Sequence, residues 1–425
     1  MSARTSSFKF KGQALDATEI GTQLKVSSIL EGSVRKAGNR LRITAQLVNV
    51  DDGFHLWSER YDRTMDDVFE VQDEITQSVV EKLKVKLLGG ADTPLVKRPT
   101  DNVEAYNLIL QGRYHLGRAT EAALEKSLAC FTQALALEPT YAQAQAGIAT
   151  VHVFRGMVSL AAPHTVMPEA KEAALRALAL DETAADAHLA LAYVLHYYEW
   201  DSAGAEREYG RALELNPGDA QARTAYASLL AETGRVDEAV AEARSAVERD
   251  PVSALPRFSL AQVFVAARRF EEAIAVAHAA IELDPSFPSS YQALGWGLVC
   301  LGRHDEAVEV FRQQVTVAPG DPMAQAGHGW ALGLAGRKQE ALTILEDLER
   351  RRSESYVGGS LLAGVCIGLG DHDRAISWLQ KAAEERDGLM TFLNSLLVSD
   401  PLRSDPRFQA LLRKMNFPQQ VDVKG

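Results

Sequence analysis

Two hydrophobic patterns divide this chain of 425 residues. Three strand-like runs lie between Ser28 and Tyr61, and in the clearest of them, residues 40–50, apolar and polar residues alternate. Beyond residue 102, apolar and small residues recur at helical spacing instead. The chain is therefore predicted to form a small sheet followed by a long helical region. The alternating run puts four apolar side chains on one face, as in a half-buried strand: Leu41, Ile43, Ala45 and Leu47.

The sheet is predicted to be a β-meander of residues 28–36, 40–50 and 54–61. Turn sequences separate the runs, Ala-Gly-Asn at residues 37–39 and Asp-Asp-Gly at residues 51–53. A short strand over residues 8–11 and a helix ending near Leu24 are expected ahead of it. That helix opens at Asp16 with Glu19 three residues later, which is a capping-box pattern.

A helix is also expected behind the meander, because Val71, Ile75, Val79 and Leu83 recur at helical spacing, with Gly89 as its stop. Together these elements make residues 1–88 a small α+β domain. Residues 89–101 carry glycine, proline and charges without periodicity, and they are predicted to be a linker.

Four prolines organise the helical region, and they lie 34 residues apart. Small residues return in the same phase, which allows two helices to pack closely, while each proline ends the second helix. A fixed period of this length indicates an array of helix-turn-helix units. The repeated positions are Pro217, Pro251, Pro285 and Pro319, the alanines Ala205, Ala239, Ala273 and Ala307, the opening residues Ala227, Ala261, Gly295 and Gly329, and the turn glycines Gly234, Gly302 and Gly336.

The repeated unit resembles the tetratricopeptide repeat family, as in YQALGWGLVCLGRHDEAVEVFRQQVTVAP at residues 291–319. The resemblance implies a mainly α fold, namely a right-handed superhelical array of paired helices. About eight repeats are expected over residues 102–389. The first has a lengthened turn over residues 118–125, and the second has an insertion around residues 156–167. Residues 390–425 are expected to form a C-terminal capping helix and tail, with Phe408, Leu411, Leu412 and Met415 covering the last apolar face.

Residues 29–76 resemble a domain found ahead of such arrays in bacterial signalling proteins, usually described as similar to the amino-terminal domain of TolB. In many relatives this domain follows a class III adenylate cyclase, protein-kinase or winged-helix DNA-binding domain. The family domain normally begins with a further strand and helix, which would precede Ser6. We therefore expect a chain cut from a longer parent, or a gene start placed too late. We also expect a meander with an uncovered edge or face.

The charge is unevenly distributed, because residues 1–100 hold 15 Lys and Arg against 14 Asp and Glu, whereas the remainder holds 30 against 43. An acidic array disfavours nucleic acid as the main partner. Cys130, Cys300 and Cys366 are far apart on apolar helical faces, which is typical of small buried side chains in a reducing compartment. No apolar run approaches membrane-spanning length, and the start lacks an apolar signal segment. We expect a cytoplasmic protein with no membrane partner.

The sequence contains no recognisable set of reactive side chains that would form a catalytic or metal-binding site. His188 and His196 share a helix but lack a third ligand at metal spacing. The glycine-rich residues 327–338 lack the spacing of a phosphate loop, and their glycines fall at repeat positions. A basic hairpin tip over residues 35–42 is either an ordinary solubilising turn or a docking site for an anionic partner. We predict no catalytic residue, no cofactor and no metal, and we do not expect an enzyme.

The remaining candidate for a functional site is a binding surface on the helical array. In tetratricopeptide arrays the first helix of each repeat lines a concave groove, and aromatic residues with a polar edge make strong interface anchors. Such residues either anchor a partner or fill gaps between neighbouring helices. The Lys and Asn residues that clamp a terminal carboxylate in some relatives are missing here, which favours an apolar or helical ligand. The groove residues that the resemblance implies are Leu189, Tyr193, His196, Phe258, Gln262, Gln292, Trp296 and Trp330.

The resulting hypothesis is a non-catalytic scaffold that binds a protein or peptide in the groove, in bacterial signalling. The alternative is the regulatory and assembly portion of an adenylate cyclase or similar enzyme whose catalytic domain is outside this chain. A third hypothesis, a periplasmic protein acting near the envelope as TolB does, needs a signal segment. The sequence leaves open whether the array also associates with a second copy of itself.

Overall fold

The computed structural model describes residues 10, 13, 15–64, 70–72, 74–76, 78–79, 100, 102–117, 120–157, 160–393, 395 and 397–415. The strand expected over residues 8–11, the helix end at Leu83 and Gly89, and the linker over residues 89–101 fall wholly or largely outside this part of the chain.

The N-terminal unit is the predicted meander. It holds the helix α2 (Ala17–Leu24) and the strands β1 (Ser28–Ala37), β2 (Arg40–Asn49) and β3 (His55–Thr64), which form one antiparallel sheet in the order β1-β2-β3. The capping box is present, because the Asp16 carboxylate accepts the backbone N–H groups of Thr18 and Glu19 and the Glu19 carboxylate accepts that of Asp16. The prediction ended the third strand three residues too early, since β3 continues to Thr64, which lies opposite Arg40 at the start of β2.

One face of this sheet is only partly covered. Described side chains from residues 71–79 pack against Ala45, Leu47, Trp57 and Tyr61 of β2 and β3. On the edge strand β1, Leu30 and Val34 lie opposite Leu47 and Ile43, yet they remain 50% and 66% exposed. The core face is thus covered over β2 and β3 and open over β1.

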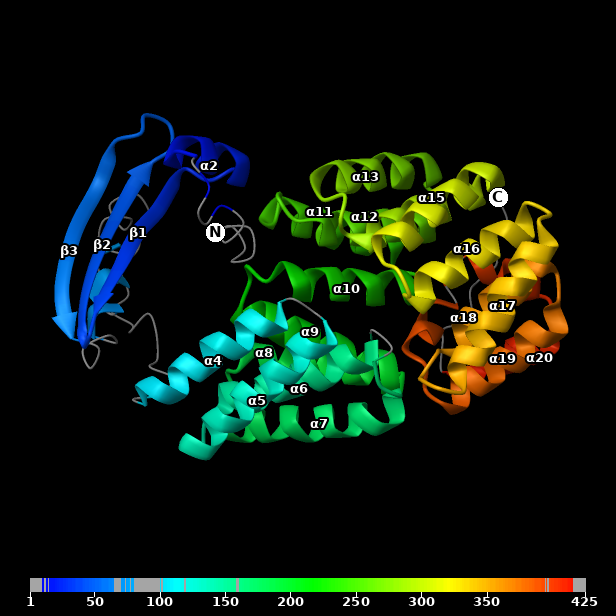
Figure 1. The fold of residues 1–425 in the computed structure, drawn as a ribbon, viewed down its shortest axis with the longest axis horizontal. Helices are drawn as coiled ribbons and strands as arrows, with labels where there is room; N and C mark the ends of the chain where they lie inside the picture. The colour runs from blue at the N-terminus through cyan, green and yellow to red at the C-terminus, as the bar shows by residue number, and fades with distance from the viewer. Residues whose placement is uncertain are drawn as a thin grey trace.

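Residues 103–384 form helical hairpins stacked side by side into a superhelical array (Figure 1). Within the described residues, eight hairpins follow one another, and the third has a π-helical turn, η2 (Leu195–Glu199), after its first helix. The helices are α4 (Val103–Leu116), α5 (Glu121–Leu137), α6 (Ala142–Met157), α7 (Pro163–Leu180), α8 (Ala185–Val194), α9 (Ser202–Leu215), α10 (Ala220–Glu232), α11 (Val236–Arg249), α12 (Ala254–Ala266), α13 (Phe270–Leu283), α14 (Pro288–Cys300), α15 (His304–Val317), α16 (Pro322–Leu334), α17 (Lys338–Arg352), α18 (Gly359–Leu369) and α19 (His372–Glu384).

The turn inside each hairpin from the third to the eighth repeats one backbone conformation. Six residues spaced 34 apart all have positive φ, which is the left-handed region that glycine enters without steric cost. Four of the six are glycines and two are not. They are Trp200 (φ 60°), Gly234 (85°), Arg268 (58°), Gly302 (73°), Gly336 (79°) and Gly370 (78°).

Small residues hold the helices at close range, as the repeat pattern predicts. A Cβ atom added at Gly295 would lie 2.4 Å from the Phe311 ring. Backbone packs closely against backbone between α16 and α18, where a Cβ at Gly368 would lie 2.4 Å from the backbone oxygen of Trp330. At Gly364, on the same helix, a Cβ would meet no atom within 4 Å.

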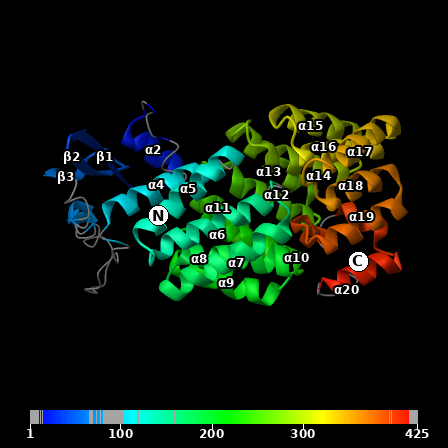
Figure 2. The same ribbon diagram turned by 60° about the horizontal axis from the view of Figure 1, so that its bottom comes forward.

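The chain does not end at the last hairpin. Two 3-10 turns, η3 (Gly388–Leu393) and η4 (Leu397–Leu402), lead to α20 (Pro406–Lys414), whose Phe408 is buried against α19. The described residues between 386 and 402 (386–393, 395 and 397–402), which we call the return segment, lie back against the middle of the array, where Figure 2 shows the orange-red ribbon beside α10. They contact residues about 190 positions earlier, since the Arg386 guanidinium donates to the backbone oxygen of Tyr198.

Within the described residues, we find no helix with the length and hydropathy that a bilayer crossing requires.

The glycines of α18 give a matched test of this packing. Gly368→Ala should destabilise the chain by about 1–3 kcal/mol, because its Cβ meets backbone that cannot move aside. Gly364→Ala should stabilise it by up to about 1 kcal/mol, because alanine favours a helix interior and the space is open. Urea denaturation of the full chain, followed by circular dichroism, measures both changes. Midpoint shifts of the same sign in the two variants would contradict the assigned helix contact.

Candidate functional site

The eight groove residues expected from the sequence lie in two places. Leu189, Tyr193 and His196 belong to the third hairpin and are buried there. His196 Nε2 lies 2.7 Å from Glu232 Oε2, its Nδ1 lies 3.2 Å from the Tyr209 hydroxyl, and the His196 and Glu232 side chains are both 2% exposed. His196 therefore serves as an internal partner that joins two hairpins and is not open to a ligand.

The return segment covers this first group. The Phe392 ring lies 6.3 Å from the Tyr197 ring, which is itself stacked on Tyr193 at 5.9 Å. The Arg386 guanidinium lies 4.1 Å above the Trp200 ring, close enough for a cation–π contact. We call the side of the array formed by the first helices of its hairpins, such as α8, α10, α14, α16 and α18, the inner face, and part of it is thus already in contact with the chain's own return segment.

Arg268, the other non-glycine residue at a left-handed turn, also contacts the return segment. Its guanidinium lies 3.1 Å from the Asp400 carboxylate. Both hairpins in which glycine is replaced at this turn, by Trp200 and by Arg268, are therefore in contact with residues 386–402.

The second group lies further along the array. Gln292 and Trp296 of α14 and Trp330 of α16 line one pocket, while Phe258 packs beside Trp296 with its ring centroid 6.5 Å away. Trp330 is 6% exposed and lies edge-on to Phe311, whereas Trp296 is half-buried. Gln262 is buried in α12, outside this pocket lining. Trp330 thus both fills the interior and lines the pocket, while Trp296 has an open face.

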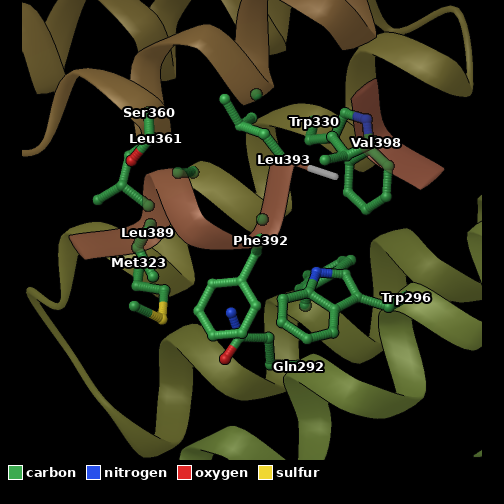
Figure 3. Close-up of a pocket in the computed structure, with 14 residues that line it drawn as sticks. Gln292, Trp296, Met323, Trp330, Ser360, Leu361, Leu389, Phe392, Leu393 and Val398 are labelled. Carbon is green, nitrogen blue, oxygen red and sulfur yellow. The ribbon is translucent and has the colours of Figure 1, made fainter. Parts of the chain in front are cut away.

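The pocket has two walls, shown in Figure 3. One wall is the array, which contributes Met323 of α16 and Leu361 of α18 as well as the two tryptophans. The other wall is the return segment, which contributes Leu389, Phe392, Leu393 and Val398. The pocket is half-open, mostly apolar and about 110 Å³ in volume.

Asp387 fixes the start of the second wall. Its carboxylate accepts the backbone N–H and the hydroxyl of Ser360, at the first turn of α18, and the backbone N–H of Leu389. Burial raises the pKa of this carboxyl above its usual value, against the effect of these donors. The return segment is therefore tied to α18, whose Gly364 also lines the pocket and is called the pocket floor below.

The sequence prediction missed the second wall and the floor at Gly364. Its only signal was the run of apolar residues beyond the last repeat, Leu389, Met390, Phe392 and Leu393, which lack a helical period. Local spacing indicates that such residues are buried, but it does not indicate which distant surface they cover.

Two cysteines lie on helices that line the pocket, Cys300 on α14 and Cys366 on α18. Burial raises the pKa of the Cys300 and Cys366 thiols to about 12, so neither is a thiolate nucleophile at neutral pH. Among the described residues, no three His, Cys, Asp or Glu side chains converge as a metal site would require. The pocket lining offers apolar surface, two indole rings and the Gln292 amide.

Comparison with known proteins identifies the repeats. A tetratricopeptide repeat family model matches residues 195–254 and 258–322. A curated relative, "Putative adenylate cyclase 3" of Rhizobium meliloti (strain 1021), is 38% identical over 149 residues, which cover 35% of this chain. The chain matches about a quarter, 25%, of the length of that relative. The chain thus carries tetratricopeptide repeats.

Solved structures share the fold. The human "IFIT1 dimer with m7Gppp-AAAA" has a TM-score of 0.50 at 17% identity, covering 74% of this chain and 78% of that one. A second structure, "YrrB: a TPR protein with an unusual peptide-binding site", covers 46% of this chain and 95% of that one, with a TM-score of 0.31 at 18% identity. The first likeness agrees with a superhelical array of paired helices.

Replacing Phe392 tests whether the return segment is held on the inner face. Phe392→Ala removes its ring from Tyr197 and from the pocket wall, and should cost less local stability than the about 3–5 kcal/mol of a fully buried phenylalanine, because Phe392 is only partly buried. Amide hydrogen exchange in residues 386–402 should then quicken about tenfold or more, while α4–α7 keep their protection. Phe54→Ala, at an exposed turn of the sheet, is the matched control. Unchanged exchange in residues 386–402 would show that Phe392 does not anchor the segment.

Proposed function

We propose that this chain is a non-catalytic scaffold that binds a segment of a partner protein on the inner face of its repeat array. Tetratricopeptide repeat arrays are generally interaction modules and not catalysts, and the family match supports this class of function. The single observation that carries the proposal is the half-open apolar pocket lined by Trp296 and Trp330. Indole rings combine large apolar area with a polar edge, which is why tryptophan is frequent at binding hot spots.

The inner face supports a narrower site than the continuous groove expected from the sequence. The return segment lies over Tyr197 and Trp200 in the third hairpin, so a partner has open access mainly at the pocket. The excess of acidic residues beyond residue 100 disfavours a nucleic acid there, because phosphates would be repelled. A protein segment with apolar side chains fits the lining best.

A role in bacterial signalling is the second part of the proposal. The relative with 38% identity is described as a putative adenylate cyclase, and the match covers only 25% of it. The alternative is therefore that this chain is the regulatory or assembly portion of such an enzyme. The resemblance of residues 1–88 to the amino-terminal domain of TolB stays a prediction. Genomic sequence upstream of Met1 distinguishes the two hypotheses, since an in-frame cyclase domain would favour the alternative.

Replacing Trp296 tests partner binding. The full chain and its Trp296→Ala variant are used to capture proteins from a bacterial extract, with Tyr114→Ala, at an exposed site on α4, as control. We expect a partner whose recovery falls about tenfold or more in Trp296→Ala and is unchanged in the control. Trp330 is a poorer probe, because it is buried against Phe311 and its loss would also lower stability.

Two further readouts decide the interpretation. Quantitative mass spectrometry measures recovery, and a thermal melt of each variant confirms that folding is retained. Identical partner recovery by wild type and Trp296→Ala would contradict the proposed binding face. A large fall in melting temperature with unchanged recovery would mean that Trp296 is a core residue.

A further inference from the structure

The pocket between α14, α16, α18 and the return segment contains space that the chain itself does not fill. Protein interiors are normally close-packed, so an unfilled apolar pocket that opens to solvent is a candidate binding site. Its volume of about 110 Å³ approaches that of a cavity able to take one benzene-sized group. We propose that this pocket takes a single bulky apolar side chain, such as phenylalanine or leucine, from the partner segment. This inference rests on the proposed function and names what the site recognises.

The pocket floor is shaped by the absence of a side chain. A Cβ atom at Gly364 of α18 would meet no atom within 4 Å, so the space above this residue is open. Gly327 of α16 also lines the pocket, but a Cβ there would lie 2.7 Å from the Phe311 ring. Gly364 is therefore the position at which a side chain can be added into the pocket without a clash at its first atom.

The chain's own return segment indicates what kind of group fits. Leu389, Phe392 and Leu393 are side chains of the short 3-10 turn η3, and they already lie against this part of the inner face. The surface thus accepts bulky apolar side chains presented by a peptide backbone. An additional side chain of the same kind would complete the contact between the two walls.

A peptide side chain suits the pocket better than a fatty acid does. The described residues of the lining include the Gln292 amide and the Ser360 hydroxyl, and they include no lysine, arginine or histidine. A fatty acid carboxylate would find no cationic partner there, and leaving a charge unpaired near apolar surface is costly. The amide of Gln292 can donate to or accept from the main chain of a peptide.

The test uses the full chain and amino-acid probes. N-acetyl-phenylalaninamide and N-acetyl-leucinamide are titrated while the indole N–H resonances of the five tryptophans are recorded. We expect the signals of Trp296 and Trp330 to shift in a saturable way, while those of Trp57, Trp200 and Trp378 stay unchanged. N-acetyl-glycinamide, which has no side chain, should give no shift.

Two outcomes of this titration would overturn the inference. One is the absence of any saturable shift at Trp296 and Trp330 with either bulky amide. The other is a shift produced by decanoate at concentrations at which both bulky amides have no effect, which would make the pocket a fatty-acid site.

A matched pair of variants locates the probe. Gly364→Leu fills the pocket from its floor and should weaken probe binding about tenfold or more. Gly210→Leu is the control, because Gly210 also lies inside a helix, α9, and its Cβ would likewise meet no atom within 4 Å. Probe binding that is equal in the two variants would overturn the inference. Because wild type alone gives the first readout, the test does not depend on either variant folding.

Partner capture separates this inference from the proposed function. If Trp296→Ala loses the partner but Gly364→Leu retains it, the inner face binds a protein and the pocket does not receive its side chain. If neither variant loses a partner, the proposed function itself fails. Loss in both variants, with Gly210→Leu unchanged, supports both.

Discussion

The fold depends on covering an apolar inner face. Stacked helical hairpins bury most of their apolar surface against their neighbours, but the first helices still present aromatic and aliphatic side chains to the inside of the superhelix. Exposed apolar area of this kind is normally covered by a partner or by the chain itself. Here the return segment covers part of it, with Phe392 against Tyr197 and four of its side chains opposite Trp296 and Trp330. The return segment leaves the pocket beside Trp296 and Trp330 open.

Two hairpin turns depart from the repeat pattern at the places where they contact the return segment. A non-glycine residue in the left-handed region costs about 1–2 kcal/mol, so glycine is the expected residue at each hairpin turn. Trp200 and Arg268 are the two departures in the six hairpins from the third to the eighth, and each contacts the return segment, through Arg386 and Asp400. The cation–π contact on buried Trp200 can offset a cost of that size, whereas the exposed ion pair of Arg268 contributes less.

The sequence predicted the parts of this structure that depend on local spacing. The period of 34 residues, the small residues at helix contacts and the capping box at Asp16 are local patterns, and the described structure confirms them. The path of the return segment is not local, since Arg386 and Tyr198 are 188 residues apart, and no periodicity relates them. For the same reason His196 was assigned to the groove, although its partner Glu232 in the next hairpin holds it inside. The third strand of the sheet ended later than predicted because pairing with β2, and not its own pattern, sets its length.

The pocket and the covering of the inner face both depend on the return segment lying against that face. The most direct measurement is a nuclear Overhauser experiment on the full chain with selectively labelled aromatic rings. We expect cross-peaks between the Phe392 and Tyr197 rings, whose centroids are 6.3 Å apart. A Phe392 ring that shows no contact with Tyr197 and has the averaged signal of a solvent-exposed side chain would contradict it.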